Sequence, residues 1–80
     1  MNNKQKYEKV FIETFSLKKN NFKKDIKYNS LKEWDSVGHM TMIGNLEEAF
    51  NITMEMDDII DFSSFKKGIE ILKKYQIDIK

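Results

Sequence analysis

Apolar residues recur at helical spacing along most of the chain. In the first segment they follow the i, i+3, i+4, i+7, i+8 pattern of one helical stripe, formed by Tyr7, Val10, Phe11, Thr14 and Phe15. This pattern predicts a helix over residues 3–17. The polar run at 18–21 favours a turn, so a long connection over residues 18–35 follows. Its apolar anchors are Phe22, Ile26, Tyr28 and Leu31.

A second helix is predicted over residues 36–50. Its expected inner stripe is Val37, Met40, Ile43, Leu46 and Phe50. Asp35 or Ser36 can cap its start, because either side-chain oxygen can accept a hydrogen bond from the first turn. Gly38 and Gly44 each weaken a helix by about 1 kcal/mol relative to alanine. Packing must offset that loss, or the glycines allow another group to approach closely.

The last third of the chain predicts a short helix over residues 57–62 and a closing helix over residues 64–76. Ser63 or Ser64 can cap the closing helix. Its expected inner stripe is Phe65, Ile69 and Leu72, with Tyr75 or Gln76. The expected fold is therefore all-α: one domain over residues 1–80, a four-helix bundle with three main helices, one short helix and a long first loop.

The size and composition of the chain restrict its chemistry. A chain of 80 residues supports one modest core, and we do not expect a deep enclosed active site. The absence of cysteine excludes disulfides, thiolate metal sites and cysteine nucleophiles. No apolar run approaches the length of about 18 residues that spans a membrane, and none follows the basic start as a signal peptide would. We expect a soluble protein of the cytoplasm.

Charge is strongly segregated along the chain, although the net charge is only +1. Residues 1–33 carry nine lysines against four carboxylates, and residues 63–80 carry five lysines against two. Between them, residues 34–62 carry seven carboxylates and neither Lys nor Arg. An acidic middle suggests docking to a basic partner. The alternative is that these charged residues simply lie on solvent-exposed helix faces, and that their segregation along the chain has no functional meaning.

Few residue combinations suggest catalysis. Ser36 and His39 lie three apart at a helix start, so their side chains could face one another, as a nucleophile and its base need. No Gly-x-Ser-x-Gly elbow surrounds the serine, so a small Ser36/His39 esterase is only an alternative interpretation. The carboxylates Asp57, Asp58 and Asp61 lack the ligand pattern of a calcium loop, and we expect no metal site.

Nucleic-acid binding is a further possibility to weigh. Lys18, Lys19, Lys23, Lys24 and Lys27 surround two aromatic residues, Phe22 and Tyr28. The near-neutral charge of the chain and its acidic middle argue against this function, and we expect no nucleic-acid partner.

Ser36 is the most informative single residue. It follows a long loop and opens an amphipathic helix, so its hydroxyl should be exposed beside the unpaired amides of the first turn. A phosphodiester on that hydroxyl would meet the partial positive charge of a helix start. The simpler alternative is a plain helix cap.

Two motifs at a fixed spacing distinguish this serine. Residues 34–40 read Trp-Asp-Ser-Val-Gly-His-Met, and residues 46–52 read Leu-Glu-Glu-Ala-Phe-Asn-Ile. The pair resembles the acyl carrier protein family, which has Asp-Ser-Leu at the head of its second helix and Leu-Glu-Glu-x-Phe-x-Ile near that helix's end. The spacing between the motifs has no insertion, and the likeness covers nearly the whole chain.

This resemblance implies that Ser36 carries a 4'-phosphopantetheine arm, transferred from coenzyme A by a magnesium-dependent phosphopantetheinyl transferase. The thiol of the arm would hold acyl groups as thioesters, and the carrier itself would catalyse nothing. Expected partners are the transferase, an acyl-loading ligase or synthase, and acyltransferases with basic docking patches. The expected recognition residues are Asp35, Val37, Met40, Glu47, Glu48, Asp57 and Asp58. We expect a monomer.

An acyl chain could be sheltered between the helices. The candidate residues are Val37, Met40, Ile43, Leu46, Phe50, Met54 and Phe62. Ordinary core packing is the alternative for each of them, and the sequence leaves open whether the chain is buried at all.

Departures from the family pattern narrow the role. Many fatty-acid carriers have acidic residues where this chain has Gly38 and Thr41, and they are more acidic overall. The resemblance therefore favours a specialised carrier, like those of surface-polysaccharide, lipid-modification or polyketide-like clusters, although fatty-acid-like synthesis stays open. The Gly-Gly-His/Asp-Ser signature of peptidyl carriers is absent. A helical interaction module that has lost modification is the remaining alternative.

Overall fold

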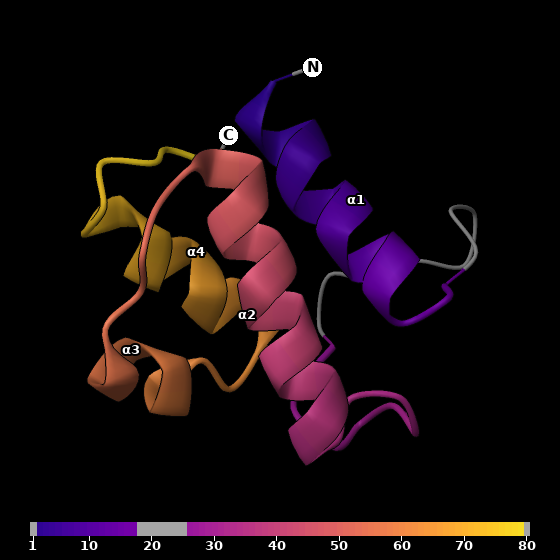
Figure 1. The fold of residues 1–80 in the computed structure, drawn as a ribbon. Coiled ribbons are helices and arrows are strands. Elements are labelled where there is room, and N and C mark those ends of the chain that lie inside the picture. The colour runs from indigo at the N-terminus through magenta and orange to yellow at the C-terminus, as the bar shows by residue number, and fades with distance from the viewer. Residues whose placement is uncertain (1, 18–25, 80) are drawn as a thin grey trace.

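The computed structural model describes residues 2–17 and 26–79, which form an all-helical bundle (Figure 1). Its helices are α1 (Asn3–Thr14), α2 (Ser36–Phe50), α3 (Met56–Asp61) and α4 (Phe65–Lys73). α1 packs against α2, and the short α3 lies at one edge of the bundle. The predicted all-α fold with a long first connection is confirmed. Within the described residues, no helix has both the length and the apolar character needed to cross a membrane.

α1 begins at a capping box and ends short of residue 17. The Asn2 side chain accepts the backbone N–H of Gln5 at 2.8 Å, and the Gln5 side chain accepts the backbone N–H of Asn2 at 3.2 Å. At the other end Ser16 has a left-handed conformation, with φ of 55°, which stops the helix at Thr14. The predicted stripe is otherwise correct, since Tyr7, Val10, Phe11 and Phe15 are buried.

α2 has the predicted bounds, but its inner face is displaced around the helix axis. Val37 and Met40 are 77% and 54% exposed, so their predicted burial is wrong. The buried residues of α2 are Met42, Ile43 and Leu46, while Phe50 is partly buried. The half-buried His39 occupies the inward position in the first turn. The inward-facing residue of the first turn is thus polar. For this reason the pattern of apolar residues predicted the wrong side of α2 as the side that faces the core.

The helices α3 and α4 lie close to their predicted positions. Ser64 caps α4, because its hydroxyl accepts the backbone N–H of Lys67 at 2.9 Å. α4 ends at Lys73, short of residue 76, and the chain turns through Gln76, where φ is 64°. Ile77 follows this turn and is buried, so the chain still contributes to the core there.

Aromatic side chains fill much of the core. The ring of Phe11 lies at the centre, with five ring neighbours at centroid distances between 5.0 and 6.2 Å: Tyr7, Phe15, Trp34, Phe62 and Phe65. Trp34 is fully buried, which the apolar pattern did not predict. Packing is so close at Gly68 that an added Cβ would lie 2.1 Å from the Phe62 ring.

The described part of the first connection is tied to the segment between α3 and α4. Phe65 donates its backbone N–H to Ile26 at 3.0 Å, and Tyr28 donates to Ser63 at 2.9 Å. Ile26 is buried, as expected of an anchor. Phe22 and the lysines at 18, 19, 23 and 24 fall outside the described residues. These backbone bonds bring Tyr28 beside the start of α2.

Candidate functional site around Ser36

Ser36 is the first residue of α2 and is exposed. The backbone of Asp35 is extended, and its carboxylate accepts the N–H of Gly38 at 2.9 Å. Asp35, not Ser36, therefore caps the helix. The Ser36 hydroxyl instead lies 3.2 Å from the Tyr28 hydroxyl, and either group can donate.

Gly38 allows the preceding chain to pack closely on the turn that carries Ser36. A Cβ at this position would lie 1.9 Å from the backbone oxygen of Glu33. Any side chain would push the first turn of α2 away from the connection. This glycine is thus explained by close approach, one of the two possibilities that its sequence position left open.

Both ring nitrogens of His39 bond to groups other than Ser36. The indole N–H of Trp34 donates to Nδ1 at 3.0 Å, and Nε2 lies 2.8 Å from the backbone oxygen of Ile59. Because an indole can only donate and a carbonyl can only accept, the two bonds require the neutral tautomer with hydrogen on Nε2. His39 thereby links α2 to α3. The Ser36–His39 dyad that an esterase needs is not assembled in this arrangement.

An apolar groove opens beside Ser36, between the start of α2 and α3, with a volume of about 360 Å³. It is lined by Tyr28, Ser36, His39, Met40, Met56, Ile59, Ile60, Phe62 and Ser63. Large apolar side chains around it are exposed, including Met56 and Ile60 on α3 and Val37 next to the serine. Exposed apolar side chains gathered on one surface are typical of a docking or ligand-binding site.

The structure divides the residues predicted to shelter an acyl chain. Ile43, Leu46, Met54 and Phe62 are core residues, and Phe50 is partly buried against them. Val37 and Met40 lie at the surface. Of this predicted set, Met40 and Phe62 line the groove. The structure therefore brings part of the set to Ser36 and leaves the remainder inside the bundle.

The predicted recognition carboxylates occupy different environments. Glu48 and Asp57 are exposed, and Asp35 caps α2. The carboxylate of Glu47 accepts the backbone N–H of Met54 at 2.8 Å, which holds the connection between α2 and α3. The side chain of Asp58 is only 7% exposed. Glu48 and Asp57 are thus better placed than Asp58 to meet a partner.

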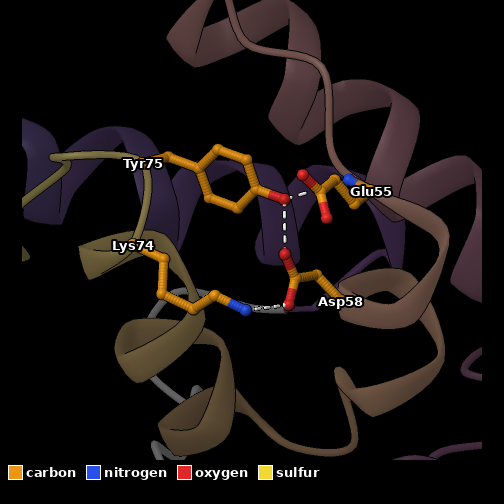
Figure 2. Close-up of polar contacts among 4 residues, drawn as sticks. All are labelled: Glu55, Asp58, Lys74 and Tyr75. Atoms are coloured by element: carbon orange, nitrogen blue, oxygen red, sulfur yellow. Dashed lines mark hydrogen bonds and ion pairs between the residues drawn. The ribbon is translucent and has the colours of Figure 1, made fainter.

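Asp58 fastens α3 to the end of α4 (Figure 2). Its two carboxylate oxygens accept from Lys74 Nζ and from the Tyr75 hydroxyl, each at 2.5 Å. The Tyr75 hydroxyl in turn accepts the backbone N–H of Glu55 at 2.9 Å. The hydrogen bonds from Lys74 and Tyr75 hold the pKa of Asp58 below its ordinary value of 3.8. Burial and the bond to Asp58 raise the pKa of Tyr75.

Sequence reasoning missed the parts that Tyr28 and Trp34 play in this site. It placed Trp34 within a motif and Tyr28 among apolar anchors, without assigning either a contact. For Trp34 a usable signal exists, because the indole N–H of a buried tryptophan usually finds a polar partner, here His39 a short distance along the chain. Tyr28 is 38% exposed, so its contact with Ser36 has no such signal.

No group of three or more His, Asp or Glu side chains that could hold a metal ion is found among residues 2–17 and 26–79. A scan against protein-family models and searches of curated proteins and of solved structures find no match to this chain.

Proposed function

We propose that this chain is an acyl carrier protein, which holds acyl groups as thioesters on a 4'-phosphopantetheine arm attached to Ser36. The observation that supports this most directly is the exposed Ser36 hydroxyl, relieved of capping by Asp35 and placed beside an apolar groove. This serine lies within the motif pair that resembles the acyl carrier protein family. In this role the chain catalyses nothing and serves partner enzymes.

The residues around Ser36 fit a phosphodiester-linked arm. The Ser36 hydroxyl is accessible to a modifying enzyme, and the nearby Tyr28 hydroxyl can donate to a phosphate oxygen. The apolar side chains of Met40 and Met56 offer the arm a surface to lie against. When bound, the arm supplies a thiol, which forms the thioester with the acyl group. The chain itself has no thiol, because it contains no cysteine.

Attachment requires only a nucleophilic oxygen from this chain. The Ser36 oxygen attacks the pantetheine-bearing phosphorus of the coenzyme A pyrophosphate, and the bond from that phosphorus to 3',5'-ADP breaks. The hydroxyl proton passes to a base of the transferase, and 3',5'-ADP leaves. That base belongs to the transferase because His39 is bonded to Trp34 and Ile59 instead.

Partner enzymes would dock on the surface around Ser36. Val37 and Met40 provide exposed apolar contacts, while Asp57 adds exposed negative charge. Glu48 is also exposed, but it lies near the other end of α2, where it lines a hollow together with Lys6 and Lys9 of α1. Residues 34–62 contain no Lys or Arg to oppose a basic patch. Such charges raise association rates and selectivity more than affinity, which suits a carrier that must leave each enzyme. The near-neutral net charge of +1 favours a specialised pathway.

Intact mass tests the proposal directly. The purified protein is incubated with coenzyme A, magnesium and a broad-specificity phosphopantetheinyl transferase. We expect a mass gain of one phosphopantetheinyl group, which Ser36→Ala abolishes. The fold should survive this substitution, because Ser36 is exposed and does not cap α2.

Ser63→Ala is the matched control, since Ser63 is another exposed serine that lines the same groove. It should accept the group like the unsubstituted protein. No mass gain in the unsubstituted protein, with the transferase active on a known carrier, would overturn the proposal. That result would favour an unmodified helical interaction module, which would use the same exposed apolar surface for docking.

A further inference from the structure

Tyr28 is held in place by its backbone and its ring, and its hydroxyl reaches Ser36. Its backbone N–H donates to Ser63 at 2.9 Å, beside the isolated bridge that pairs Lys27 with Ser64. Its ring meets the His39 ring edge to face, with centroids 5.6 Å apart and planes at 87°. These contacts leave the hydroxyl 3.2 Å from the Ser36 oxygen.

His39 gives Tyr28 a fixed surface to pack on. The His39 ring bonds through one nitrogen to Trp34 and through the other to Ile59, so the ring cannot rotate without losing a hydrogen bond. The ring is also nearly coplanar with that of the fully buried Trp34, with the planes 14° apart, as their in-plane hydrogen bond requires. The position of the Tyr28 hydroxyl is thus set by the same residues that join α2 to α3.

We propose that Tyr28 is a positioning residue for Ser36: its hydroxyl orients the serine for arm transfer and afterwards donates a hydrogen bond to the phosphodiester. This inference rests on the proposed function, and it assigns to one side chain a role that neither the apolar pattern nor the family resemblance gives. Tyr28 and Ser36 both line the groove, so the bond would direct the arm toward Met40 and Met56, which line it as well.

Before transfer either hydroxyl can donate in this hydrogen bond, and the proposed role uses the arrangement in which Tyr28 donates. When Tyr28 donates to the Ser36 oxygen, the serine's own hydrogen is free to point at the base of the transferase. A lone pair then remains for attack on phosphorus. After transfer the serine oxygen is esterified and can no longer donate, whereas the phosphodiester carries a full negative charge on its non-bridging oxygens. A phenol bond to such an oxygen is charge-assisted.

Tyr28→Phe tests this role, because it removes the hydroxyl and keeps the ring that packs on His39. We expect kcat for arm transfer to fall about five- to tenfold, as loss of one hydrogen bond predicts, while KM for the carrier stays unchanged. In the loaded protein, the ³¹P resonance of the phosphodiester should shift relative to the unsubstituted carrier. The thermal midpoint of the unloaded protein should stay the same.

Tyr75→Phe is the matched control, since it removes a tyrosine hydroxyl that bonds to Asp58, at a place outside the groove lining. It should lower the thermal midpoint and leave both kcat and the ³¹P resonance unchanged. An unchanged kcat and ³¹P resonance in Tyr28→Phe would overturn the inference, as would a rise in KM alone. If the unsubstituted protein accepts no arm, both the inference and the proposed function fail, whereas a loaded protein insensitive to Tyr28→Phe refutes only the inference.

Discussion

Two groups of apolar side chains on the same helix have opposite environments. Met42, Ile43 and Leu46 are at most 1% exposed and belong to the core, whereas Val37 and Met40 are more than half exposed beside Ser36. Burial of apolar surface stabilises a fold by about 25 cal/mol per Å², so the outward residues forgo stability that inward placement would give. The contrast indicates that the inner face of α2 serves the fold, and it supports the docking surface that we propose on the outer face.

The largest expected effect is a difference in stability between two variants, one with a substitution on each face of α2. Met42→Ala should lower the free energy of unfolding by about 2–5 kcal/mol, because it leaves a cavity in a packed core. Met40→Ala should change it by about 0.5 kcal/mol or less, as is usual for exposed positions. Chemical denaturation of both variants measures the difference.

The same pair of variants separates fold from function. Met40→Ala should raise KM for the carrier in arm transfer, because Met40 lies on the proposed docking surface, while its unfolding curve stays close to that of the unsubstituted protein. Equal losses of stability in the two variants would contradict the division of α2 into an inner and an outer face.

The fold was largely predictable from the sequence, but the buried face of α2 was not. The stripe of α1 and the bounds of α2 follow from apolar spacing and from capping residues. Of the two pairs of candidate caps, the structure selects Asp35 over Ser36 and Ser64 over Ser63. The error on α2 arose at His39. Its ring lies inward because Trp34 and Ile59 satisfy both nitrogens, and a pattern of apolar residues does not reveal a half-buried histidine of this kind.

The sequence identified Ser36 as a candidate, but it did not identify the residues that surround Ser36 in the structure. Motif and position both selected the serine, but its bond to Tyr28 depends on a backbone pairing between Tyr28 and Ser63, which are far apart in the sequence. Similarly, the run of acidic residues did not indicate that Asp58 is buried and Asp57 is exposed. The Asp58 carboxylate bonds to Lys74 and Tyr75, just beyond the end of α4, and is buried, whereas Asp57 is exposed; only the tertiary structure sets this difference.

An intermediate effect is expected where α3 is attached to α4. Asp58→Asn should lower the free energy of unfolding at neutral pH by about 1–2 kcal/mol, because the carboxylate loses charge-assisted hydrogen bonds. The pKa of Asp58 lies below 3.8 in the folded protein. As pH falls through the window below that value, the unfolded chain takes up the proton first, so stability decreases. Urea denaturation at several acidic pH values measures this slope.

The neighbouring Asp57→Asn is the control for the acid dependence, because Asp57 is an exposed carboxylate on the same helix. Asp58→Asn should flatten the loss of stability in this pH window, while Asp57→Asn should leave the slope as it is in the unsubstituted protein. An unaltered slope in Asp58→Asn would show that the bonds to Lys74 and Tyr75 do not persist in solution.

The smallest expected effect is a gain in stability, and it tests whether the outer face of α2 is free of packing contacts. Gly44 is exposed, and an added Cβ would meet nothing within 4 Å. Gly44→Ala should therefore raise the free energy of unfolding by about 0.4–1 kcal/mol, because alanine restricts the unfolded chain and favours the helix. The same change at Gly38, where a Cβ would lie 1.9 Å from the Glu33 oxygen, should lower it. A loss of stability in Gly44→Ala would mean that this face is packed against other residues of the chain, and the outer surface of α2 would then no longer be available for a partner.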